Sequence, residues 1–164
     1  MFSSIRLRAA HSLITGIMTM SLLLCGAGGC SRAATKPANS ISAADLEVLT
    51  QYESMRAALA ADNIAKAHSA GEKLLKAVDA EGVTPGIVKS RLASKIMAES
   101  YRLEVLRAAF KEFSQSLVPV CRGVDGYYIV SSELISDGVW VQTSQVIDNP
   151  YLGRSMALYG EIRK

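Results

Sequence analysis

The chain has 164 residues, of which 49% are hydrophobic and only 6% aromatic, a composition that suits one domain with an aliphatic core. The formal net charge is +3, but Arg6 and Arg8 lie close to the N-terminus. Without these two, 16 of the 18 Lys and Arg remain against 15 Asp and Glu. A chain this close to neutrality offers no electrostatic basis for binding a phosphate backbone, so we expect no nucleic acid partner.

The pattern of residues 1–29 is typical of a signal peptide. A basic start with Arg6 and Arg8 precedes the apolar stretch Leu13–Leu24, and the small residues Gly26–Gly29 follow it. A membrane-spanning helix is the alternative, but such a helix needs about 20 apolar residues. This stretch is shorter and is followed by glycines. We therefore expect export and removal of this segment.

Cys30 is the expected site of lipidation. Small residues precede it, as they do in a bacterial lipobox, although Ala27 stands where leucine is usual. Acyl chains on Cys30 would anchor the protein because each buried methylene contributes about 0.8 kcal/mol. Ser31 follows, which favours the outer membrane. We expect residues 30–42 to be the lipidated N-terminus and tether of a protein on the periplasmic side of the bacterial cell envelope.

Residues 43–164 are expected to form a single domain that begins with two helices. Ser42 caps the first, and Leu49, Tyr52 and Met55 follow with helical spacing. Residues 62–63 interrupt this pattern and can cap a second helix, whose apolar stripe extends to residue 78.

A loop over residues 80–86 comes next, with Thr84 as cap and Pro85 at the first helical position. The apolar pattern then continues from Ile87 to Val118. It fits either one long third helix or two helices that meet near residues 98–101, and we expect Pro119 to end it. Short helices are marginal alone, so their apolar stripes must pack together.

The last part of the domain, about residues 123–160, has the composition of strands. Two β-branched and aromatic runs flank Ser136-Asp137-Gly138, which predicts a β-hairpin. The sequence DNPYLG then predicts a turn, because Pro150 fixes φ and Gly153 permits a left-handed conformation. The predicted fold is mainly α: an antiparallel three- or four-helix bundle with a small C-terminal β-hairpin and a Pro/Gly turn.

An enzyme is not expected, because the sequence contains neither a catalytic triad with histidine nor a glycine-rich phosphate loop. The weak candidates for soft-metal ligands are Cys121 and Met156, and Cys121, which precedes the first strand, can approach Met156 across the hairpin. A cysteine in such a position is more often a small buried residue. His68 lies beside an apolar stripe, and Met55 and Met97 have the spacing of core residues.

A family resemblance covers about residues 46–160. Its marks are RAALAADNIAKAHSAGEKLLKAV, RLEVLRAAFKEFSQSL, Trp140 in a strand and IDNPYLGRSM, which contains Asn149, Pro150, Tyr151, Gly153 and Met156. Together they resemble an uncharacterised bacterial periplasmic domain. That domain occurs as small lipoproteins and also fused to membrane-fusion subunits of heavy-metal (copper/silver) efflux pumps.

The resemblance implies a soft-metal site made by Cys-Pro-Met and a later Cys-Gly, which suits Cu(I). This chain departs from that pattern: Ser132, Glu133 and Leu134 replace the first motif, and Tyr159 replaces the second cysteine. Only Met156 remains, so the resemblance implies a degenerate site for Cu(I) or another soft metal.

Two functions follow from the sequence. The first is a lipid-anchored accessory protein linked to heavy-metal handling or efflux, with the membrane and efflux or envelope proteins as partners. The alternative is a protein-binding or scaffolding envelope lipoprotein without metal. In the alternative, Tyr127, Tyr128, Trp140 and Tyr151 are expected to form a contact surface.

Overall fold

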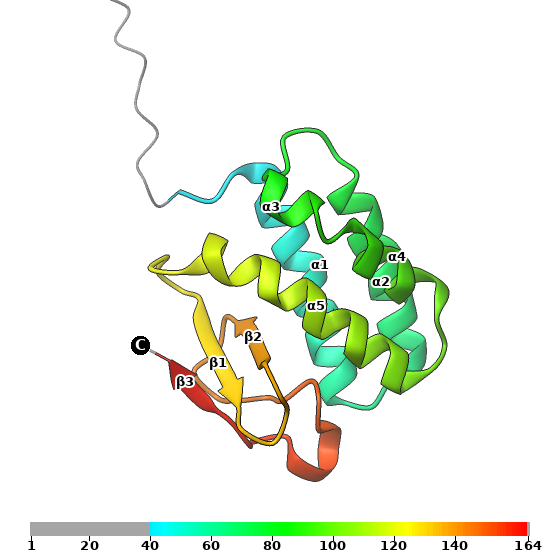
Figure 1. Cartoon of the computed structure of the whole chain (residues 1–164), viewed down its shortest axis with the longest axis vertical. Coiled ribbons are helices and arrows are strands. Elements are labelled where there is room, and N and C mark those ends of the chain that lie inside the picture. Colours follow the sequence, from blue (N-terminus) through cyan, green and yellow to red (C-terminus); the bar gives the residue numbers. More distant parts are fainter. Residues whose placement is uncertain (1–39, 164) are drawn as a thin grey trace, which may run out of the picture. The chain divides into compact units, whose positions relative to one another are not determined.

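The computed structural model describes residues 40–163, so the expected signal peptide and Cys30 lie outside the described residues. The described chain is mainly helical and ends in a small antiparallel sheet (Figure 1). Within this part of the chain, none of the helices combines the length and the apolar character that crossing a membrane requires. The elements are α1 (Ala43–Ala60), α2 (Ile64–Val78), α3 (Pro85–Val88), α4 (Arg91–Glu99), α5 (Leu103–Cys121), β1 (Tyr128–Ser132), β2 (Gly138–Gln142), the 3-10 helix η1 (Gly153–Met156) and β3 (Glu161–Arg163).

The predicted starts of the first two helices are confirmed. The Ser42 hydroxyl accepts a hydrogen bond from the Asp45 amide at 3.0 Å. The Asn63 side chain accepts one from the Lys66 amide, also at 3.0 Å. Each cap supplies an acceptor for an amide that the first helical turn leaves without a backbone partner. Pro85 is the first residue of α3, as its missing amide favours.

The segment after Pro85 is divided more finely than the sequence alone indicated. Ser100 adopts an extended conformation, which separates α4 from α5 and decides between the two alternatives of one helix or two. The prediction that Pro119 ends the helix is wrong, because α5 continues to Cys121. A proline in the last turn removes only one backbone hydrogen bond there. Leu117 and Cys121, both buried, hold that turn against the core.

The helices pack in a sequence of neighbours: α1 against α2, α2 against α4, and α4 against α5. α5 lies between the other helices and the sheet (Figure 1) and contacts β2 and β1. The close approach of α2 and α4 needs Gly71, because a Cβ there would lie 2.5 Å from the Met97 carbonyl oxygen.

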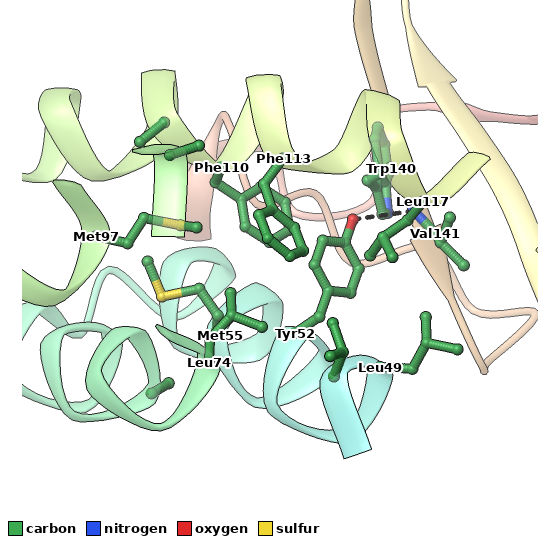
Figure 2. Packing of buried hydrophobic residues seen from close by; sticks show 14 of the residues in the cluster. Leu49, Tyr52, Met55, Leu74, Met97, Phe110, Phe113, Leu117, Trp140 and Val141 are labelled. Carbon is green, nitrogen blue, oxygen red and sulfur yellow. Dashed lines mark hydrogen bonds between the residues drawn. The ribbon is translucent and has the colours of Figure 1, made fainter. Parts of the chain in front are cut away.

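The core is aromatic and sulfur-rich where α1 meets α5. Tyr52 stacks on Phe110 with ring centroids 4.7 Å apart and lies 6.1 Å from Phe113. Figure 2 shows Met55 and Met97 within the same cluster, and both are completely buried, as predicted. Full burial of one such side chain contributes roughly 1.5–3 kcal/mol, so this cluster holds the helices together.

The C-terminal hairpin is confirmed, with β1 and β2 antiparallel and Val130 opposite Trp140. A third strand was not predicted. β3 pairs antiparallel with β1, placing Ile162 opposite Val130, so the sheet order is β2-β1-β3. β3 has only three residues, two of them charged, so the sequence shows no alternation of apolar and polar residues that would predict a strand. β3 forms because the preceding turn places it beside the unpaired edge of β1.

Candidate functional site

The residues from Asn149 to Tyr159, here called the C-terminal corner, are organised around the side chain of Asn149. This side chain is completely buried. Its carbonyl oxygen accepts hydrogen bonds from the amides of Tyr151 at 2.8 Å and Leu152 at 3.1 Å. Its amide group donates to the Tyr159 carbonyl at 2.6 Å. One side chain thus closes both ends of the corner, which explains the asparagine before Pro150.

Tyr151 and Trp140 form the apolar contact of the C-terminal corner with the body of the protein. Trp140 is completely buried and Tyr151 is 7% exposed. Their rings meet edge to face with centroids 5.8 Å apart, and Tyr151 also lies 5.9 Å from Phe110. The Trp140 indole donates to the Gln142 side-chain oxygen at 2.9 Å. Both aromatic side chains are therefore packed and hydrogen-bonded within the molecule.

Two tyrosine hydroxyls complete the outer edge of β2. The Tyr52 hydroxyl accepts a hydrogen bond from the Val141 amide at 3.1 Å, drawn in Figure 2. The Tyr151 hydroxyl donates to the Val139 carbonyl at 2.5 Å. These backbone groups point away from β1, so the hydroxyls take the place of a neighbouring strand. Burial raises the pKa of both tyrosines, which keeps them protonated.

Asp62 and Arg107 fix the C-terminal corner to the helices. Arg107, from α5, donates to the Pro150 carbonyl at 2.9 Å and to the Asp62 carboxylate at 2.6 Å. The Asp62 carboxylate also accepts from the Arg154 amide at 3.0 Å, and this bond, with Arg107, lowers the pKa of Asp62. Gly153 lies directly against these groups with φ 63°, and a Cβ there would collide with Asp62. The glycine of DNPYLG is thus required for both its conformation and its size.

Arg56 forms a second connection that the sequence analysis did not identify. It is 5% exposed and donates to the Asp148 carbonyl at 2.7 Å and to the Asp148 carboxylate at 3.0 Å. A second acid, Glu53, pairs with it at 2.8 Å. The sequence feature that could have indicated this connection is the position of Arg56 within the apolar stripe of the first helix. A long cation at a core position is stable only when its charge is paired.

The two soft-ligand candidates do not meet, so the prediction that Cys121 can approach Met156 across the hairpin is wrong. Cys121 is buried at the end of α5, where desolvation, aided by the charge of Asp45, raises its pKa to about 12. Asp45 is in the first turn of α1, so Cys121 lies near the start of that helix. Met156 lies near its end, because the side chain of Arg154, two residues earlier, donates to the carbonyl of Ala61, which follows α1. The two sites are separated by the 18 residues of α1, on the order of 27 Å.

Met156 is 40% exposed, and Leu158 and Tyr159, shortly after it, are exposed as well. Leu158 and Tyr159 line a cleft of about 300 Å³ together with Glu133. Of the positions where the resemblance expects ligands, 159 lies in this cleft and carries a phenol, beside Glu133, which stands at the position of the motif's proline. A larger cleft of about 600 Å³ lies between α5 and the β1–β2 turn and includes Ser132.

Among residues 40–163, no group of three or more His, Cys, Asp or Glu side chains is placed to hold a metal ion. His68 lies against Tyr101, with ring centroids 3.8 Å apart, and its buried Nδ1 has no hydrogen-bond partner. An isolated imidazole of this kind is a boundary residue, as predicted, and brings no second ligand with it.

The expected aromatic contact surface is also wrong in part. Trp140 and Tyr151 are interior residues, whereas Tyr127 and Tyr128 are half-buried. The exposed apolar side chains at this end of the molecule are instead Leu134, Met156, Leu158 and Tyr159, which we call the C-terminal patch. Leu158 is 73% exposed and Leu134 is 53% exposed.

Comparison with models of known families, with curated proteins and with solved structures gives no match.

Proposed function

We propose that this protein is a lipid-anchored accessory protein of the bacterial cell envelope, held on the periplasmic side of the outer membrane, that acts by binding a partner protein. The observation that carries the proposal is the construction of the C-terminal corner. A buried asparagine, an aspartate and two arginines fix a segment whose outer surface is apolar. Burying Leu158 and Tyr159 against a partner would remove this apolar surface from water.

The position of the protein in the cell is proposed from the sequence. The basic, apolar and small-residue segments before Cys30 support export and acylation. By resemblance, the partner is an envelope protein of heavy-metal efflux. The finer arrangement of the helices is part of the proposal: α1, α2, α4 and α5 act as one antiparallel bundle that supports the sheet. The contacts between neighbouring helices support this arrangement.

A site-specific photo-crosslinker tests the binding surface in intact cells. Placed at Leu158, it should give one dominant cross-linked envelope protein. The matched control position is Leu46, which is also an exposed leucine, 51% accessible, but lies on α1. The same products from both positions, or none from Leu158, would remove the C-terminal patch as a binding surface. The intact mass of the purified protein tests the acyl chains on Cys30 independently.

The second candidate is an accessory protein that itself binds Cu(I) weakly through a degenerate site. The exposed thioether of Met156, close to the cleft lined by Glu133 and Tyr159, is the observation that favours it. Anaerobic titration with Cu(I) against a competing chelator should then show binding that Met156→Leu abolishes. Cys121→Ser is the matched control and should leave binding unchanged, because that thiol is buried far from Met156.

A further inference from the structure

The outward face of α3 and α4 carries a second exposed apolar surface, which the binding function proposed above does not use. Val88, Leu92 and Ile96 are spaced by four residues and are 41%, 69% and 38% exposed. Tyr101, 67% exposed, follows α4. We call these four residues the α4 stripe. Leu92 and Ile96 are four apart on α4 and lie on one face of that helix, and Val88, the last residue of α3, precedes them.

The opposite face of α4 already provides its packing. Ala93, Ser94 and Met97 are buried, and α4 contacts both α2 and α5 through that side. The α4 stripe is therefore additional apolar surface that the fold does not need. Leu92, the second residue of α4, is 69% exposed, and a group of such exposed apolar side chains marks an interaction surface.

The charges around the α4 stripe favour an anionic surface. Residues 85–102 contain four basic side chains, namely Lys89, Arg91, Lys95 and Arg102, against one acidic side chain, Glu99. Three of the four pair with acids at the surface: Arg91 with Asp79 at 2.6 Å, Lys95 with Glu99 at 3.8 Å and Arg102 with Glu104. Such exposed pairs contribute little to stability and leave these cations open to anionic headgroups. Apolar residues flanked by Lys and Arg are the pattern of helices that lie in the interface of a bilayer. Tyrosine is enriched at the same depth.

The attachment of the tether places the α4 stripe close to the lipid anchor. Ser40, the first described residue, lines one cleft together with Thr84 and Gly86 at the start of α3. Thr84 donates to the Asp45 carboxylate at 2.7 Å, which ties α3 to the start of α1. Ten residues separate Cys30 from Ser40, and an extended chain of that length spans at most about 35 Å. The length of this tether therefore limits how far α3 can lie from the membrane.

We infer that the α4 stripe is the face with which the anchored domain lies on a phospholipid surface containing anionic headgroups. This inference rests on the proposed acylation of Cys30, since the anchor supplies the high local concentration that a short stripe needs. α5 lies between α4 and the sheet (Figure 1), so membrane contact through α4 turns the C-terminal patch, on the sheet side of α5, away from the bilayer and toward the periplasm. Anchoring and partner binding then use different faces of one domain.

Tryptophan fluorescence with brominated phospholipids tests the inference on the full lipidated protein. The chain has one tryptophan, Trp140, which is buried and gives a constant background. The variants are Leu92→Trp in the α4 stripe and Leu158→Trp as the matched control. In vesicles of phosphatidylethanolamine and brominated phosphatidylglycerol, we expect strong quenching and a blue shift at position 92 and little change at position 158.

Equal quenching at the two positions, or none at position 92 in vesicle-bound protein, would overturn the inference. A blue shift at position 92 that follows protein concentration and not lipid would also overturn it, because a second copy would then cover the stripe. If the intact mass shows no acyl chain on Cys30, the proposed function fails on its own. The α4 stripe is then judged by the same quenching after vesicles are added to the unlipidated protein.

Discussion

Replacing Asn149 by alanine tests whether the C-terminal corner is organised as the structure indicates. The substitution removes two hydrogen bonds accepted from the amides of Tyr151 and Leu152 and one donated to the Tyr159 carbonyl. Each contributes about 1 kcal/mol net, and leaving buried backbone groups without partners adds to the loss. We expect Asn149→Ala to lower the free energy of unfolding by about 3–5 kcal/mol, a large fraction of the stability of a small domain.

Urea unfolding followed by circular dichroism measures this effect. With an m-value of about 2 kcal/mol/M, the midpoint should fall by about 2 M. Asn63→Ala is the matched control, because Asn63 also accepts an amide hydrogen bond but at the more exposed start of α2. Loss of a helix cap costs about 1 kcal/mol. If the two variants lose the same stability, Asn149 is an ordinary turn residue and the organisation described for the corner is wrong.

Three further predictions concern the packing and ionisation of the core. Gly71→Ala should destabilise the fold by about 1–3 kcal/mol in urea unfolding, because the added methyl meets a backbone carbonyl of α4, whereas Gly86→Ala, with nothing closer than 4.0 Å, should not. Tyr151→Phe should cost about 1–3 kcal/mol by leaving the Val139 carbonyl unpaired; an unchanged melting temperature would show that water replaces the hydroxyl. The raised pKa of Cys121, about 12, means that stability is fully present below the pKa of the unfolded thiol, near 9, and falls as pH rises toward 12. Cys121→Ala should remove that part of the alkaline decline, and the native thiol should not react with thiol reagents at pH 8.

Local sequence determined the boundaries that depend on local chemistry. Ser42 and Asn63 cap helices because their side chains reach amides three residues ahead. The hairpin follows from β-branched runs around Ser136-Asp137-Gly138, and Asp137 indeed has φ 55°. The turn at Pro150 was likewise visible, since proline and glycine restrict or extend the accessible conformations of their own residues. None of these features requires a partner distant in the chain.

Tertiary structure decided which side chains are interior and which lie together. Trp140 and Tyr151 look like binding residues in the sequence, but they are buried because the corner folds back onto α5. Arg56 meets Asp148, and Asp62 meets Arg107, across more than 40 residues of chain. Such pairings depend on the packing angle of whole helices, which no local pattern specifies. For the same reason, the two candidate soft ligands, Cys121 and Met156, lie near opposite ends of α1. The three-residue strand β3 formed because the edge of β1 was unpaired there.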